Sequence, residues 1–482
     1  MWRRAARPLV THTWVRTATA LSFSRASSSA AGQPTPETHP HLLCPGELTA
    51  GFTADEYRRR RCALARRLPV NSVAIIAAAL PAHLPNTIIP YPGYRQDADF
   101  AYLTGMLQPG VVMMLQPQSG EDHRYTLFVP PRSKRDEVWN GAKVGTEAAL
   151  RFFEADETHE LPSMPGVIAR AVRNATAVYA DDDGHAAVAL SAAGQMHSCG
   201  PLQALRPLVH ALRWTKSPAE MLALRECAAA DIEGFHSAIR ASVPGALEYQ
   251  VCHQHEHTVK MLGACRLAYP SVVGSGPGAL IVHYAAMDRA MQSGDVLLMD
   301  AGCERRGYVS DITRTWPVDE GGFTNAQADV YEAVLEAHTT CLKAARPGVS
   351  LQDLHRLSVD VLSECLVNLG VGGGMSKTEM MRGGYQRYYP HSVGHWLGMD
   401  THDTPTITTG AQMQPGCVFT IEPGLYFPAD DLSVPKSLRG IGVRIEDDIA
   451  MTLDTAEVEV LSGGLPVGRR EVEALVCGLR AR

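Results

Sequence analysis

Two aspartates in the stretch 296–316 have a spacing that could bind a cation. An apolar run ends at Asp300, a polar loop containing glycine follows, and Asp311 opens a second β-rich run, which together predict a β-hairpin. If the turn is centred on Arg305 and Arg306, the two aspartates lie directly opposite each other, with Cβ atoms roughly 4.5–5.5 Å apart. Like charges in that position destabilise a hairpin, so a cation between them is one interpretation. Two solvent-facing aspartates at strand ends are the other, because aspartate is common beside turns.

A histidine-rich stretch, 390–403, supplies nitrogen ligands. His391 and His395 are four positions apart, as a metal-binding pair on a helix would be. Pro390 and Gly394 argue against a helix, so we expect a strand and loop here.

Two further stretches place acidic residues at strand ends. In 418–426 the alternation points Glu422 away from the apolar side chains, and in 442–449 it places Arg444 and Glu446 together on one face. Each stretch alone is consistent with a charged, solvated face. With the hairpin and the histidines they supply Asp300, Asp311, His395, Glu422 and Glu446.

Four carboxylates and one imidazole suit two divalent ions that share bridging carboxylates. Such an oxygen-dominated set favours Mn(II), with Co(II) or Zn(II) as alternatives, over a sulfur-type structural zinc site. Two ions roughly 3.5–4 Å apart can supply a hydroxide nucleophile and polarise a scissile carbonyl, so the set predicts metal-assisted hydrolysis.

The order Asp, Asp, His, Glu, Glu in these motifs resembles aminopeptidase P, the X-Pro aminopeptidase branch of the pita-bread metallopeptidases. The resemblance rests on the runs 299–302, 310–316, 391–400, 421–426 and 442–448 and extends over nearly the whole chain from about Gly32. The run 32–43 resembles the start of the mature mitochondrial form. The resemblance implies an α+β fold in which a duplicated α/β pita-bread domain follows a smaller α/β domain.

The resemblance also implies roles for single residues. Its expected metal ligands are Asp300, Asp311, His395, Glu422 and Glu446; its expected catalytic residues are His391, His402 and Glu422; its expected substrate-binding residues are Tyr269, His283, His402, Tyr426, Arg444 and Trp139. Glu422 would carry a proton to the leaving nitrogen, and His391 and His402 would donate hydrogen bonds to the oxyanion or the leaving side. Ala101 stands where relatives often have an aromatic residue.

Three functions remain open at this point. The favoured one is release of the N-terminal residue from peptides with proline at the second position. The second is an intermediate-cleaving aminopeptidase, which removes one bulky residue from imported mitochondrial proteins without requiring proline. The third is a metal-free binding protein of the same fold, although relatives of that kind have lost ligands and here all five are present.

Composition limits the possible partners. The net charge is −7 and the chain has no basic stripe, so nucleic acid is not an expected partner. No apolar run reaches the ~18 residues of a membrane span. The 11 cysteines are odd in number and scattered, which favours a reducing compartment over a disulfide framework. Peptide or protein N-termini are the expected substrates, and the resemblance suggests a homodimer or larger oligomer.

The N-terminus has the composition of a transit peptide. Several arginines and serines precede the first acidic residue, Glu37, which is typical of organelle targeting segments. We therefore expect a mitochondrial transit peptide over 1–40 and a mitochondrial location. A disordered basic tail and a cytoplasmic location are the alternatives.

The elements that must position the site fall into two predicted domains. Residues 46–213 have the pattern of an α/β domain, and the catalytic domain is expected over 214–482. Its first helix is signalled by a capping box at Ser217 and Glu220 with Pro218 at the first helical position. Two helix–Pro-Gly–helix units, broken at 244–245 and 347–348, predict an internal duplication.

A second histidine group lies outside this site. His253, His255 and His257 alternate within a helical pattern, and we interpret them as part of a surface helix, with adventitious metal binding as the alternative.

Overall fold

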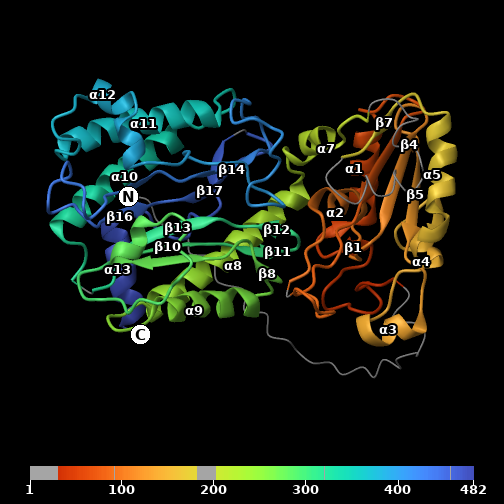
Figure 1. Cartoon of the computed structure of the whole chain (residues 1–482), viewed down its shortest axis with the longest axis horizontal. Helices are drawn as coiled ribbons and strands as arrows, with labels where there is room; N and C mark the ends of the chain where they lie inside the picture. The colour runs from red at the N-terminus through yellow and green to blue at the C-terminus, as the bar shows by residue number, and fades with distance from the viewer. Residues whose placement is uncertain (1–30, 92, 182–201, 320, 456, 482) are drawn as a thin grey trace, which may run out of the picture.

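The chain forms two lobes that lie side by side (Figure 1). The computed structural model describes residues 31–91, 93–181, 202–319, 321–455 and 457–481. The N-terminal lobe contains β1 to β7 with their helices, the C-terminal lobe contains α8 to α13, and α7 lies between them. Both lobes mix helices and strands, and the second is the larger, so the predicted fold class is confirmed.

The N-terminal lobe is built on a five-stranded sheet with the strand order β6-β5-β4-β3-β7. Strands β3, β4 and β5 are antiparallel neighbours, whereas β6 and β7 add parallel edges. Helix α5 packs against one face of this sheet, and α1 and α2 pack against the other. The elements are β1 (Glu47–Thr49), β2 (Phe52–Thr53), α1 (Ala54–Ala65), β3 (Val73–Ala77), α2 (Ala98–Thr104), β4 (Val112–Pro117), β5 (His123–Val129), α3 (Lys134–Asn140), α4 (Thr146–Arg151), β6 (Glu157–Glu160), η1 (Leu161–Ser163), α5 (Met164–Arg173), β7 (Val178–Tyr179) and α7 (Arg206–Arg213).

The segment that precedes β1 is anchored to this lobe by one side chain. The Gln33 amide donates to the carbonyls of Leu48 (3.2 Å) and Gly105 (3.1 Å), and its oxygen accepts from the Leu107 backbone N–H (2.9 Å). Residues 31–40 of the predicted transit peptide are therefore described and packed, whereas residues 1–30 lie outside the described part of the chain.

The C-terminal lobe contains two helix pairs and several short antiparallel sheets. The Ser217 hydroxyl accepts from the Glu220 N–H and the Glu220 carboxylate accepts from the Ser217 N–H, so the predicted capping box starts α8. The α8–α9 and α10–α11 pairs flank the Pro-Gly breaks, as the duplicated pita-bread fold requires. Among the helices of the described residues, none has the length and apolar content needed to cross a membrane. The elements are α8 (Pro218–Ala241), α9 (Glu248–Met261), β8 (Arg266–Leu267), β9 (Val272–Ser275), η2 (Gly276–Leu280), β10 (Val296–Ala301), β11 (Cys303–Arg305), β12 (Tyr308–Val309), β13 (Ile312–Pro317), α10 (Asn325–Ala344), α11 (Leu351–Asn368), α12 (Lys377–Met381), η3 (Gly384–Arg387), β14 (Val418–Ile421), β15 (Gly424–Tyr426), β16 (Gly442–Arg444), β17 (Asp447–Met451), β18 (Val458–Val460) and α13 (Arg469–Arg480).

The hairpin that carries the two aspartates has a different register from the one predicted. Its turn is Arg306-Gly307, with φ of 55° and 79°, one residue later than expected. Two positive φ angles are what a two-residue hairpin turn requires, and glycine adopts them readily. Asp300 consequently pairs with Thr313, so the prediction that Asp300 and Asp311 lie directly opposite is wrong.

An ionic cluster joins the lobes. Arg213, at the end of α7, donates to Asp99 of the N-terminal lobe at 2.5 Å and to Asp400 and Asp403 of the C-terminal lobe at 2.7 and 2.5 Å. Lys216 adds a second cation to Asp403, at 3.0 Å. Arg213, Lys216, Asp99 and Asp403 are all buried, so the cluster is part of the boundary between the lobes.

Candidate metal centre

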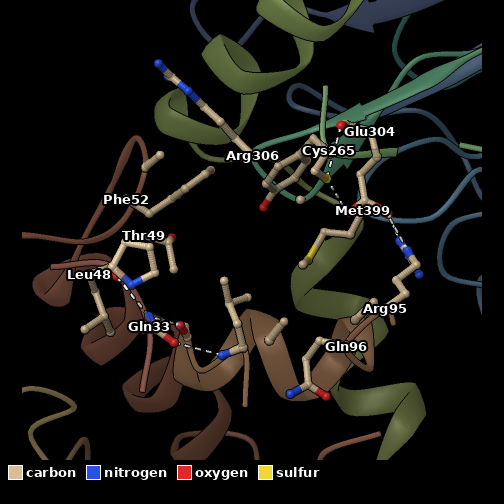
Figure 2. A pocket seen from close by; sticks show the side chains of 18 of the residues that line it. Gln33, Leu48, Thr49, Phe52, Arg95, Gln96, Cys265, Glu304, Arg306 and Met399 are labelled. Carbon is tan, nitrogen blue, oxygen red and sulfur yellow. Dashed lines mark hydrogen bonds and ion pairs between the residues drawn. The ribbon is translucent and has the colours of Figure 1, made fainter. Parts of the chain in front are cut away.

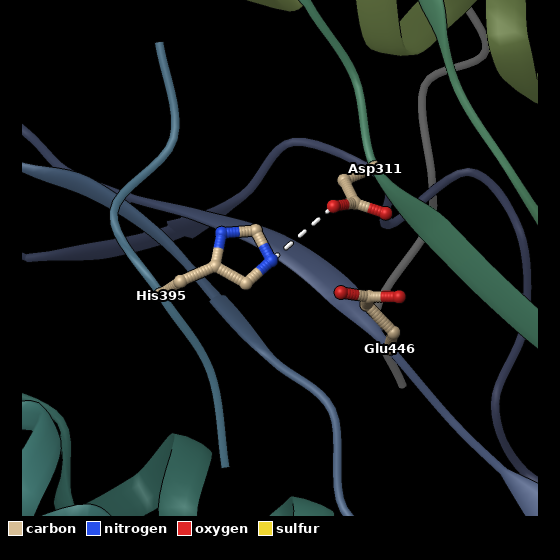
Figure 3. A group of neighbouring side chains, drawn as sticks. All are labelled: Asp311, His395 and Glu446. Carbon is tan, nitrogen blue, oxygen red and sulfur yellow. Dashed lines mark ion pairs between the residues drawn. The ribbon is translucent and has the colours of Figure 1, made fainter. Parts of the chain in front are cut away.

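Three of the predicted ligands converge within the C-terminal lobe (Figure 3). One ligand atom from each of Asp311, His395 and Glu446 lies within 4.8 Å of the others. Asp311 follows β12, His395 lies in the loop before β14, and Glu446 lies between β16 and β17. The His395 Nε2 atom is 3.3 Å from Asp311 Oδ2. As expected, the histidine-rich stretch is not helical.

The other two predicted ligands border this group. The Tyr269 hydroxyl oxygen is 2.6 Å from Asp300 Oδ1 and 2.5 Å from Asp311 Oδ1, so the two carboxylates approach each other despite the altered register. Glu422 Oε1 is 3.6 Å from His395 Nε2. The structure therefore brings all five residues of the predicted ligand set together.

The electrostatics of this group show an excess of negative charge. Burial, and then repulsion from neighbouring carboxylates, raise the pKa of Glu446 well above its ordinary value. Burial raises the pKa of Glu422 to about 7, with repulsion from Asp311 and Asp300 adding to the effect. Burial opposes protonation of His395, but the nearby Asp311 and Glu422 carboxylates raise its pKa to about 9. Buried like charges of this kind are stabilised by bound cations, so the donor set fits divalent metal ions.

A hydrogen-bonded chain connects Asp300 to His391. Arg444 is fully buried; its Nη2 donates to Asp300 Oδ2 at 2.5 Å and its Nη1 donates to the Tyr426 hydroxyl at 2.7 Å. The Tyr426 oxygen is 2.9 Å from His391 Nε2, and His391 Nδ1 is 2.9 Å from the Ser392 carbonyl oxygen.

This chain fixes the tautomer of His391. A carbonyl oxygen only accepts, so Nδ1 carries the proton, and burial lowers the pKa of His391 to about 3, so Nε2 is unprotonated and accepts from Tyr426. Both ring nitrogens are thus occupied. In this arrangement His391 has no N–H left to donate to a substrate, unlike the role that the sequence suggested.

His402 and His283 are the exposed histidines of the predicted site. His402 is exposed, and its ring centroid is 4.4 Å from that of His395. Burial of part of the ring lowers the pKa of His402, and repulsion from His395 and His283 lowers it further, against the effect of Asp311, which raises it. The lowered pKa favours the neutral ring of His402, which carries one N–H that can donate.

Trp139 is the predicted site residue that the described chain does not bring to this cluster. It lies on α3, at the far end of the N-terminal lobe (Figure 1), and its side chain is 82% exposed.

Two residues near the centre were not singled out from the sequence. The Thr313 hydroxyl donates to Glu446 Oε2 at 2.7 Å and accepts from Arg444 Nε at 3.1 Å, so it orients two predicted site residues. The ring of Tyr389 packs edge-on against that of His391, with centroids 5.0 Å apart. Thr313 lies within the motif that follows Asp311, but only the folded structure shows which of its side chains face the centre.

A separate cavity of about 410 Å³ lies between the lobes (Figure 2). Its walls come from the segment that Gln33 anchors, from α1 and α2, and from the hairpin around Glu304 and Tyr308. None of the predicted site residues lines it among those described.

Comparison with known proteins agrees with this geometry. "Metallopeptidase family M24" matches residues 223–453, and "Aminopeptidase P, N-terminal domain" matches residues 57–179. The chain is 36% identical to the Arabidopsis thaliana protein named "Intermediate cleaving peptidase 55, mitochondrial", over 92% of this chain and 87% of that one. It is 34% identical to human "Xaa-Pro aminopeptidase 3", over 92% of this chain and 90% of that one.

Solved structures give the same result. Aminopeptidase P from E. coli with the inhibitor Pro-Leu superposes with a TM-score of 0.83 at 31% identity, covering 89% of this chain and all of that one. Proline aminopeptidase P II from Yersinia pestis gives a TM-score of 0.82 at 33% identity, over 88% of this chain and 99% of that one. The resemblance drawn from the sequence is thus confirmed: the chain is an enzyme of metallopeptidase family M24 and carries the N-terminal domain of aminopeptidase P.

Proposed function

We propose that this chain is a dinuclear-metal aminopeptidase that releases the N-terminal residue from peptides with proline at the second position. The observation that carries the proposal is the convergence of five potential ligands in one cluster, in which Asp311 and Glu446 are buried and Asp300, His395 and Glu422 are half-buried. The names of the relatives, most of them Xaa-Pro aminopeptidases, support this substrate class.

The five converging residues are proposed to hold two divalent ions. Four carboxylates balance two dications, and an oxygen-rich donor set favours Mn(II), with Co(II) or Zn(II) as alternatives. A Zn-substituted form of the E. coli relative has been solved with product bound. When bound, such ions lower the pKa of water and polarise a carbonyl oxygen.

The surrounding side chains have separate tasks in this proposal. Glu422 lies between His391 and His395, 3.8 Å and 3.6 Å away, where its carboxylate can carry a proton to the leaving nitrogen. His402 is the proposed donor to the developing oxyanion because it is exposed and keeps a free N–H. His391, whose nitrogens are occupied, orients Tyr426 and through it Arg444.

Substrate binding is assigned to residues around the cluster. His283 and His402, which are exposed, are proposed to contact the substrate together with Tyr269, Tyr426 and Arg444, which bond to the predicted ligands or to each other. A role for Trp139 in closing the substrate pocket is proposed from the resemblance alone.

Intermediate cleavage is the second candidate function. It is favoured by the relatives from Arabidopsis thaliana and Schizosaccharomyces pombe, which are named intermediate cleaving peptidase 55. Together with the arginine-rich start of the chain, these names support a mitochondrial location and a transit peptide within 1–40. We further propose that the enzyme forms a homodimer or larger oligomer. The boundary between its two domains is proposed to lie near residues 213 and 214.

A matched pair of peptides tests the proposed function. One peptide has tyrosine followed by proline at its N-terminus, and the other has tyrosine followed by alanine. Xaa-Pro specificity predicts that the manganese-loaded enzyme has a kcat/KM about 100-fold or more higher for the first peptide, which corresponds to about 3 kcal/mol of transition-state discrimination. Equal rates would favour the intermediate-cleaving function, and no turnover of either peptide would reject both.

A metal-ligand variant is the control for this experiment. Asp311→Asn should abolish turnover of both peptides while its circular dichroism spectrum stays that of the wild type. Substantial activity at matched metal loading would reject the two-metal centre.

A further inference from the structure

The backbone of Asp311 is held by a side chain from outside its own hairpin. The β10–β13 ladder begins at the Ala301–Ile312 pair, so the Asp311 N–H lies beyond it. This N–H instead points at the carboxylate of Asp448 on β17, with both oxygens 3.2 Å from the nitrogen. Asp448 is 1% exposed, and no lysine or arginine forms an ion pair with it in the described residues.

The backbone of His395 is held in a similar way. Its N–H donates to the Thr420 hydroxyl on β14 at 3.2 Å, and the Thr420 N–H donates to the His395 carbonyl at 2.9 Å. Thr420 is fully buried. The loop that carries His395 is also held beside β14 by backbone bonds on either side, from the Glu422 N–H to the Val393 carbonyl at 2.7 Å and from the Leu397 N–H to the Val418 carbonyl at 3.0 Å. The bond to the Thr420 hydroxyl is the side-chain contact that holds the backbone of His395 itself.

Thr420 and Asp448 are direct partners across the β14–β17 pair. Cross-strand partners of this kind have Cβ atoms roughly 4.5–5.5 Å apart on one face of the sheet. One pair of side chains therefore contacts the backbone of two residues whose own side chains meet at 3.3 Å, His395 Nε2 to Asp311 Oδ2.

We propose that the Thr420–Asp448 pair is a positioning unit that sets the separation of Asp311 and His395 and so determines the metal affinity of the site. The inference rests on the proposed function only in taking Asp311 and His395 as ligands. A buried acidic side chain that lacks an ion-pair partner is an expensive way to satisfy a single backbone N–H, whether it is ionised or neutral. Its use here is explained if the position of that N–H decides how well metal binds. Residues that orient metal ligands typically change affinity 10–100-fold when they are removed.

Manganese binding to the metal-free, full-length protein tests this proposal. Thr420→Val is isosteric and replaces the hydroxyl with a methyl group, and Asp448→Ala removes the carboxyl group. Each should raise the Kd for Mn²⁺ measured by titration calorimetry about 10-fold or more. Asp448→Asn keeps an oxygen that accepts from Asp311, so it should stay within about 3-fold of the wild type. The Kd for Mn²⁺ of the double variant should rise by less than the product of the fold-increases of the two single variants, because both residues act on the same geometry.

Matched controls separate positioning from loss of stability. Thr126→Val alters a buried strand threonine of the N-terminal lobe whose hydroxyl has no hydrogen-bond partner. Asp431→Ala removes a buried carboxylate that bonds to Tyr388 and Ser433 and to no predicted ligand. Both should leave the Kd for Mn²⁺ unchanged.

The outcomes are distinguishable from failure of the proposed function. Kd values of Thr420→Val and Asp448→Ala within about twofold of the wild type would overturn the positioning unit, whatever happens to Tm. If Asp448→Ala does not fold, Thr420→Val decides alone. A wild-type protein that binds no Mn²⁺ or other divalent ion would instead reject the metal centre itself.

Discussion

Arg444 donates a hydrogen bond from Nη2 to Oδ2 of Asp300 at 2.5 Å, which ties a fully buried guanidinium to a predicted metal ligand. The same side chain donates to the Tyr426 hydroxyl and to the Thr313 hydroxyl. Three acceptors in three directions match the fork of a guanidinium, and a lysine ammonium cannot reach all of them.

Arg444→Lys should therefore lower kcat/KM about 10-fold or more, because Asp300 and Tyr426 lose their shared partner. Steady-state kinetics at saturating manganese measures this loss. Arg225→Lys is the control: Arg225 pairs with Glu459 at the surface and should tolerate the change. Equal kinetics in both variants would mean that Arg444 contributes charge alone.

His395 and His402 should differ in whether their loss affects metal or chemistry. His395→Ala should lose metal, since its Nε2 is at the centre of the cluster. His402→Ala should keep most metal and lose roughly 100-fold in kcat, in line with single oxyanion donors. Metal content by mass spectrometry, measured beside kcat, checks both. A metal deficit in His402→Ala with none in His395→Ala would reverse the two roles.

Asp403 should make the stability of the protein sensitive to acid. Burial favours its neutral form, but the charges of Arg213 and Lys216 lower the pKa of Asp403 from 3.8 to about 2. At pH values above the pKa that Asp403 has in the unfolded chain, its lowered pKa in the folded protein stabilises the fold. As the pH falls through the pKa of the folded protein the carboxylate becomes protonated, so this stabilisation is lost between about pH 4 and pH 2. Its full size is on the order of 2 kcal/mol.

Asp403→Asn should remove that dependence. We would measure the free energy of unfolding of both metal-free proteins in urea at several pH values from 6 downward. The wild type should be more stable than Asp403→Asn at pH 6, and this difference in unfolding free energy should become smaller below about pH 4. If the difference in unfolding free energy between the two proteins does not change with pH, the ionised carboxylate of Asp403 is not the stabilising form.

Gln33 should mark how much of the N-terminus the folded protein needs. Three hydrogen bonds join its side chain to Leu48, Gly105 and Leu107, and each contributes about 1 kcal/mol. A chain that starts at Ala31 should keep the Tm of the full-length protein, whereas one that starts at His41 should melt several degrees lower. Gln33→Ala in the longer chain should reproduce part of the loss. Equal Tm values for both truncated chains would be consistent with a transit peptide that extends to residue 40.

Sequence reasoning worked where structure is local. The capping box at Ser217, the helix ends before the two Pro-Gly pairs and the non-helical His391–His395 stretch all depend on neighbours within a few residues. The five candidate metal ligands were identified from their separate motifs, and the resemblance to aminopeptidase P then implied their roles. Their positions relative to one another could not be derived from the sequence, because no spacing relates Asp300 to Glu446.

Features that depend on pairing between distant strands could not be predicted. The register of the hairpin differs from the predicted one because the turn begins at Arg306 and not at Arg305. A shift of one residue in the turn changes which residues pair across the two strands. Thr420 and Asp448 each have unremarkable neighbours in sequence, and their shared role follows from the β14–β17 register alone. The same holds for the hydrogen bonds of His391, which depend on where Tyr426 lies after folding.

The position of Arg213 bears on whether the two lobes can exist apart. The most natural place to divide the chain, between residues 213 and 214, separates this arginine from Asp400 and Asp403 and leaves it with Asp99. A C-terminal fragment would then carry Asp403, next to His402, with Lys216 as its one remaining partner from the cluster. The lobes are thus not interchangeable modules: exchanging the first lobe with that of a relative would preserve the loop of His402 only if the incoming lobe also ended in a cation that reaches Asp400 and Asp403.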